Sequence, residues 1–103
     1  MPNYELAEAA EADLNSIALY TISKWGPKQA VRYGAVLDSH FEAIGNGKAR
    51  TRIFLQHRPE LRVSRVGHHY VFHLERETHC PLILAVFHEH MDLMTRLSDR
   101  LGG

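Results

Sequence analysis

The chain has 103 residues, of which 45% are hydrophobic and 23% charged, a composition typical of a single globular domain spanning residues 1–103. Twelve basic residues balance twelve acidic ones, which argues against a protein that coats nucleic-acid phosphates, so no direct sequence-specific nucleic-acid binding is expected. Because the single cysteine cannot form an internal disulfide, no apolar run reaches the length of a membrane span and the first residues lack a secretion signal, a cytoplasmic location is expected.

Residues 3–7 alternate enough to predict a short first strand, after which the period becomes that of a helix. Apolar residues recur at spacings of three and four from Ala10 to Trp25, and acidic residues occupy the first turn, where the helix dipole favours them. Gly26 ends this helix, and Pro27 suits the first turn of the next because its missing N–H would be unpaired there. The indole of Trp25, at the end of the apolar stripe, is predicted to be buried in the core.

A second apolar stripe at helical spacing predicts a helix from Pro27 to the glycine-rich turn at residues 45–47. Two helices of similar length joined by a tight turn are expected to pack antiparallel. The basic segment 48–60 follows without an assigned structure, although its apolar residues Ile53, Phe54 and Leu55 are expected to contact the core.

Three strand-like runs fill the rest of the chain. Residues 61–66 alternate, Gly67-His68 makes a turn, and residues 69–76 form the next run. The continuous apolar stretch 81–87 indicates a strand covered on both faces, at or near the centre of the sheet. Asp92 can cap a short C-terminal helix. The expected fold is therefore α+β, with a β-α-α-β-β-β order and a helical hairpin packed on a small antiparallel sheet.

Half of the basic residues fall within one stretch of 18 residues, opposed there by a single acid, Glu60. Each of these side chains, taken alone, is most simply interpreted as part of a solvated face. As a group they are typical of a landing surface for an acidic partner. They are Lys48, Arg50, Arg52, Arg58, Arg62 and Arg65.

In order and spacing, these features resemble the ParE toxins of the RelE/ParE superfamily of type II toxin–antitoxin systems. The likeness spans nearly the whole chain and rests on residues of both helices and the end of the last strand. They are Asp13-Leu14, Ile17, Tyr20, Trp25-Gly26, Gln29-Ala30, Tyr33 and His88-Glu89-His90-Met91-Asp92.

The resemblance implies a toxin that inhibits DNA gyrase by binding it, so no catalytic residues and no cofactor are expected. It also implies a hetero-oligomer with a ParD-like antitoxin that neutralises the toxin. A groove between the hairpin and the open sheet edge would take an antitoxin helix and then a strand, two recurrent modes of peptide recognition. We expect Ile17, Tyr20, Arg62 and Arg65 to bind the antitoxin.

Several alternatives remain open at this stage. RelE-like cleavage of messenger RNA on the ribosome would use His88 or His90 for proton transfer and Arg62 or Arg65 for the phosphate. The chain departs from the RelE pattern, however, because no tyrosine follows Tyr70 and histidines stand near the place of a catalytic arginine. An inactive toxin and a plain interaction module of the same fold are further alternatives.

The histidines also allow a metal site, if His88 and His90, which directly follow the third strand-like run, lay close to His73 of the neighbouring run. Their spacing matches no specific metal signature, so no metal is expected. The imidazole of His88 is expected instead to hydrogen-bond the start of the C-terminal helix or a neighbouring strand.

Overall fold

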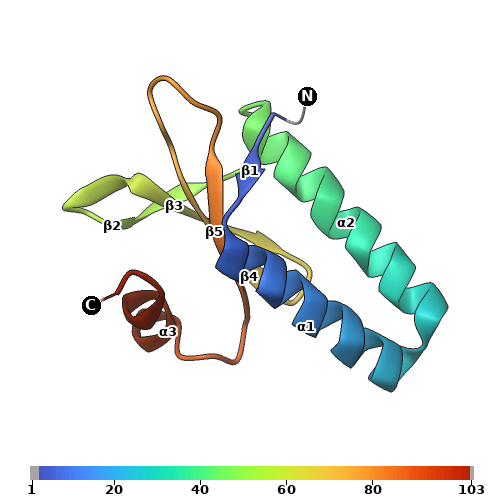
Figure 1. The fold of residues 1–103 in the computed structure, drawn as a ribbon. Helices are drawn as coiled ribbons and strands as arrows, with labels where there is room; N and C mark the ends of the chain where they lie inside the picture. The colour runs from blue at the N-terminus through green and yellow to red at the C-terminus, as the bar shows by residue number, and fades with distance from the viewer. Residues whose placement is uncertain (1–2, 103) are drawn as a thin grey trace.

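A computed structural model describes residues 3–102 and arranges them as a helical hairpin, a five-stranded sheet and a short last helix (Figure 1). The α+β class and the hairpin are thus confirmed. The unassigned basic segment contributes one further strand, β2. The elements in chain order are β1 (Glu5–Leu6), α1 (Glu8–Trp25), α2 (Pro27–Gly45), β2 (Arg52–Leu55), β3 (Arg58–Val66), β4 (His69–Leu74), β5 (Leu82–His88) and α3 (Leu93–Arg100).

The strands lie in the order β1-β5-β4-β3-β2. The pairs β2–β3, β3–β4 and β4–β5 are antiparallel, whereas β1 pairs with β5 in parallel, with Glu5 opposite Leu82. β4 takes the central position, and β5, the predicted doubly covered strand, lies beside it. β2 forms one edge of the sheet, and its pairing with β3 is irregular between Ile53 and Leu55.

Each face of the sheet has its own apolar cluster, as the alternation of side chains along the strands requires. On one face the hairpin packs against β4 and β5, and on the other α3 covers β3, β4 and β5. The hairpin cluster consists of Ala10, Leu37, Phe41, Ile44, Val71, Ile83 and Val86. The second cluster consists of Leu61, Val63, Phe72, Ala85, Phe87 and Leu97.

The hairpin turn follows the prediction, but its tip does not. Gly26 adopts a φ of 92°, a region that favours glycine, and Pro27 opens α2. The two helices run antiparallel and their joined ends project past the sheet (Figure 1). Trp25 is 68% exposed, so its predicted burial is wrong. The apolar stripe of α1 continues past the edge of the sheet, so the indole of Trp25 has no strand to pack against.

A polar clasp joins α1, β5 and α3. The Asp13 carboxylate accepts hydrogen bonds from the Val86 backbone N–H at 2.9 Å and from both terminal nitrogens of Arg100 at 2.9 and 3.0 Å. Arg100 also donates to the Leu84 carbonyl at 2.9 Å. Asp92 caps α3 as predicted, accepting from the Thr95 N–H. No helix within residues 3–102 is both long and apolar enough to span a membrane.

Candidate functional site

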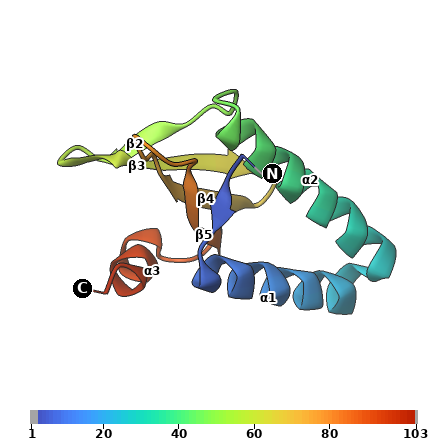
Figure 2. The ribbon, with the colours of Figure 1, turned by 45° about the horizontal axis from the view of Figure 1, so that its top comes forward.

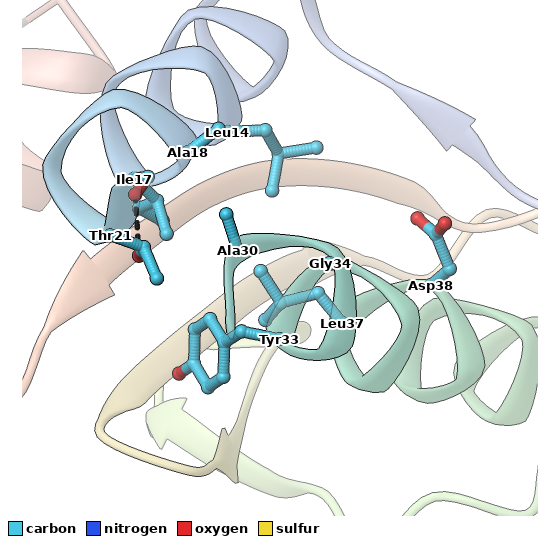
Figure 3. Close-up of a pocket in the computed structure, with 9 residues that line it drawn as sticks. All are labelled: Leu14, Ile17, Ala18, Thr21, Ala30, Tyr33, Gly34, Leu37 and Asp38. Atoms are coloured by element: carbon cyan, nitrogen blue, oxygen red, sulfur yellow. Dashed lines mark hydrogen bonds between the residues drawn. The ribbon is translucent and has the colours of Figure 1, made fainter. Parts of the chain in front are cut away.

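An apolar cleft runs between the two helices of the hairpin (Figure 3). Its volume of about 110 Å³ is well below the several hundred Å³ of typical small-molecule pockets, so it suits a few protein side chains rather than a substrate. Ile17 is in its wall, and the carbonyl of Ile17 accepts a hydrogen bond from the Thr21 hydroxyl at 2.7 Å. The lining residues are Leu14, Ile17, Ala18, Thr21, Ala30, Tyr33, Gly34, Leu37 and Asp38.

Tyr20 lies outside this cleft and is 61% exposed. It follows Asp13 by seven residues, so the two share one side of α1, the side that faces β5 and α3 through the clasp. Ile17 precedes Tyr20 by three residues and is its neighbour on the helix surface. The structure therefore places Ile17 and Tyr20 side by side, one within the cleft wall and one largely exposed to solvent.

A wider, basic groove of about 430 Å³ lies over β3 and the start of β2. Arg50 and Arg52 are exposed there, and no acidic side chain among residues 3–102 forms an ion pair with either of them. This groove combines uncompensated positive charge with one aromatic ring, a surface that suits an acidic chain. Its lining is Arg50, Thr51, Arg52, Val63, Ser64, Arg65 and Tyr70.

The two arginines predicted to bind an antitoxin occupy different surroundings. Arg65 lines the basic groove, stacks over the Tyr70 ring at 5.4 Å and forms an ion pair with Glu89. Arg62 donates to the hydroxyl and the carbonyl of Thr51, each at 3.1 Å. Residues three apart on a regular strand point to opposite faces, so Arg62 and Arg65 do not form one patch.

A cluster of aromatic and imidazole rings closes the end of the sheet beneath α2. The Tyr33 hydroxyl lies 2.5 Å from His69 Nδ1. Burial, and then the neighbouring His88, lower the pKa of His69 to about 4, so this imidazole is neutral at physiological pH. A neutral ring with Nδ1 as the acceptor fits a hydrogen bond donated by Tyr33, whose own pKa is raised by burial.

The histidines of the last strand pack against one another. The His88 ring meets His69 edge-on at 5.3 Å and His90 at 5.0 Å, and His88 Nδ1 accepts from the His90 backbone N–H. His73 lies elsewhere, opposite Ile83 and bonded to Glu75, so the structure does not bring His73 to His88 as the metal alternative would require. Register explains this, because His69 is the residue of β4 that faces His88. Across residues 3–102 no group of three or more metal-binding side chains could hold an ion.

Glu89 links this cluster to the basic groove. Its carboxylate accepts from His68 Nδ1 at 2.8 Å and from the Arg65 guanidinium. The hydrogen bond from His68, followed by the charge of Arg65, lowers the pKa of Glu89. Each oxygen of Glu89 is thus engaged by one partner. This arrangement holds the Arg65 guanidinium beside the Tyr70 ring, so Arg65 is not a free cation.

Comparison with known proteins decides the family. A family model described as the ParE toxin of the type II toxin–antitoxin system parDE matches residues 4–93. The chain belongs to this ParE toxin family. It is similar to a toxin ParE of Escherichia coli, with 44% identity over 103 residues that cover the full length of both proteins.

The fold of this ParE-family chain is also that of a solved structure titled "Chromosomal ParDE TA system from P. aeruginosa". The two superpose with a TM-score of 0.69 over 82% of this chain and 92% of the other, at 15% identity. At that identity the match bears on the fold and not on the residues of the site.

Sequence reasoning missed several residues that build the site in this ParE-family chain. Thr51 orients Arg62, while Tyr70 and Glu89 orient Arg65. Glu89 stood within a segment that already resembled the family, but its partners lie more than twenty residues away. Only the pairing of β4 with both β3 and β5 brings them together.

Proposed function

We propose that this chain is the toxin of a type II toxin–antitoxin pair, and that it inhibits DNA gyrase by binding it. A ParD-like antitoxin neutralises it within a hetero-oligomer in the cytoplasm, and no cofactor takes part. The observation that supports this most strongly is the full-length similarity to a toxin ParE. The site adds physical support, because the cleft of the hairpin is too small for a typical small substrate and the basic groove carries arginines that are unpaired within residues 3–102 and suit an acidic chain.

Two features favour an extended antitoxin segment as the neutralising ligand. The cleft of the hairpin and the neighbouring Tyr20 offer apolar contacts to an amphipathic helix. β2 is an edge strand to which a further strand can add, next to the uncompensated charges of Arg50 and Arg52. An acidic segment could reach both, with Ile17, Tyr20, Arg62 and Arg65 contributing at separate points along its path.

Binding without catalysis is favoured by the state of the titratable groups. A general base must be free to accept a proton from the substrate. Both oxygens of Glu89 are occupied, and neutral His69 is held by Tyr33. Cleavage that used Glu89 or His69 would have to break these contacts first, and His88 Nδ1 already accepts from the His90 backbone N–H.

Expression in the absence of the antitoxin tests the proposal. We expect growth arrest with DNA breaks and a damage response, because a gyrase inhibitor of this kind leaves broken DNA. Transcript integrity is followed in the same cells. Rapid cleavage of translated messages, or normal growth at confirmed protein levels, would contradict the proposal.

Charge reversal tests the proposed role of the two arginines. Arg62→Glu and Arg65→Glu, singly and together, are expected to weaken binding of an acidic antitoxin, chiefly by slowing association. The single variants test the two faces of β3 one at a time, because Arg62 and Arg65 point to opposite faces. Arg96→Glu, an exposed change on α3, is the matched control. Calorimetry that finds wild-type affinity in the double variant would refute this role.

A further inference from the structure

The tip of the helical hairpin has an unbalanced charge. Between Asp13 and Asp38 the chain contains three cations and no acidic residue. These cations, Lys24, Lys28 and Arg32, are exposed, and within residues 3–102 none of them forms an ion pair. The acidic residues of both helices lie toward their other ends, so the hairpin is positive where it leaves the sheet.

The same tip exposes large apolar side chains. Leu19, Ile22 and Trp25 follow one another at intervals of three along α1 and are 69%, 44% and 68% exposed. Val31, early in α2, is 74% exposed. Apolar side chains gathered in this way on a charged background mark an interaction surface. The outer face of α1 therefore mixes large apolar side chains with polar ones such as Ser23 and Lys24, instead of being uniformly polar as on an ordinary surface helix.

This surface, hereafter the tip patch, consists of Leu19, Ile22, Lys24, Trp25, Lys28, Val31 and Arg32. Its apolar residues on α1 lie roughly 100–160° around the helix from Tyr20, whereas Lys24, four residues after Tyr20, adjoins it. At 100° per residue, Ile22 lies roughly 160° around α1 from Tyr20 when measured the short way. Ile17 lies within the inter-helix cleft. In Figures 1 and 2 the end of the hairpin stands clear of the sheet and of α3, so a partner could reach it from several directions.

We propose that the tip patch docks onto an acidic protein surface with an apolar pocket that accepts Trp25, and that this is how the toxin holds its target. The inference rests on the proposed function. Charge complementarity selects the partner, since the same end of the hairpin carries three exposed cations and no acidic residue. Tryptophan and arginine are also the side chains that most often dominate the energy of protein interfaces.

Two other occupants fit the tip patch less well. A second copy of the tip would bring like charges together. An anionic membrane is usually bound by clusters of four to eight cations, more than the three present here. A protein surface needs fewer charges, because shape complementarity around the indole supplies much of the affinity.

The test measures two affinities for each variant, with purified DNA gyrase as the probe for the target and calorimetry for the antitoxin. Trp25→Ala and the double variant Lys28→Glu/Arg32→Glu are expected to weaken gyrase binding about tenfold or more, the scale of a lost interface anchor. Both should keep antitoxin affinity within about twofold. Met94→Ala and Arg96→Glu, exposed changes on α3, are the matched controls and should change neither affinity.

The outcomes separate this inference from the proposed function. If wild-type toxin binds gyrase and the tip variants bind equally well, the tip inference is wrong and the proposed function stands. If antitoxin affinity falls in parallel, the tip belongs to the antitoxin surface and the inference is again wrong. Binding to anionic vesicles or self-association that depends on Trp25, with unchanged gyrase affinity, also overturns it. If wild-type toxin fails to bind gyrase, the proposed function itself fails.

Discussion

The clasp between Asp13 and Arg100 should be a principal tertiary link of this fold, and its removal gives a quantitative prediction. The Asp13 carboxylate accepts three hydrogen bonds of 2.9–3.0 Å, two of them from the guanidinium. The side chains are 17% and 23% exposed, so solvent screens the pair only in part. Hydrogen bonds to charged groups contribute about 1.5–3 kcal/mol each and are not additive within one network.

We therefore expect Asp13→Ala to lower the free energy of unfolding by about 2–4 kcal/mol. In a domain of this size each kcal/mol shifts Tm by about 4–8 °C, so Tm should fall by roughly 8–32 °C. Asp13→Asn keeps an oxygen for the Val86 N–H and should lose about half as much.

Urea unfolding of Asp13→Ala, Arg100→Ala and the double variant measures the coupling directly. The cycle should give an interaction energy of about 1–2 kcal/mol, because each single change leaves a partly buried partner behind. A loss below about 0.5 kcal/mol for Asp13→Ala, the usual range of surface substitutions, would refute the assigned role of the clasp.

Two further predictions concern stability. Gly34→Ala should raise the free energy of unfolding by up to about 1 kcal/mol, because alanine favours a helix and a Cβ meets nothing within 4 Å. In Gly45→Ala the Cβ would lie 2.5 Å from the Asn3 carbonyl oxygen, so chemical denaturation should show a loss, and equal effects of the two changes would contradict the packing described. Because the pKa of folded His69 is near 4 and below its unfolded value, its contribution is complete above about pH 6.5 and is lost as pH falls toward 4. Denaturation at several pH values across this range gives the free energy of unfolding as a function of pH. For His69→Gln this free energy should rise with pH less steeply than for the wild type, by at most about 1.4 kcal/mol per pH unit. An unchanged slope would show that His69 is not the titrating group.

Local sequence signals predicted most of the fold because they act through backbone chemistry. Gly26-Pro27 predicted the hairpin turn, and the apolar stripe that predicted α2 contains the buried Leu37 and Phe41. β2 escaped prediction because its four residues include an irregular pairing and do not alternate cleanly. β2 forms because it pairs with β3, and the residues of β2 alone do not indicate that pairing.

The site was less predictable because it depends on how far the elements reach and how the strands align. α1 has 18 residues, about 27 Å of helix, and nothing in its own sequence says where the sheet beneath it ends. Trp25 was assigned to the core for that reason. The contact of Tyr33 with His69 joins residues 36 positions apart, and it follows from the packing of α2 on the sheet.

The measurement that tests the central claim most directly is a supercoiling reaction with purified gyrase and purified toxin, run with and without the antitoxin. We predict inhibition with accumulation of broken DNA, relieved when antitoxin is added in equal amount. Full gyrase activity at saturating toxin, together with cleavage of ribosome-bound message by the same preparation, would contradict the account.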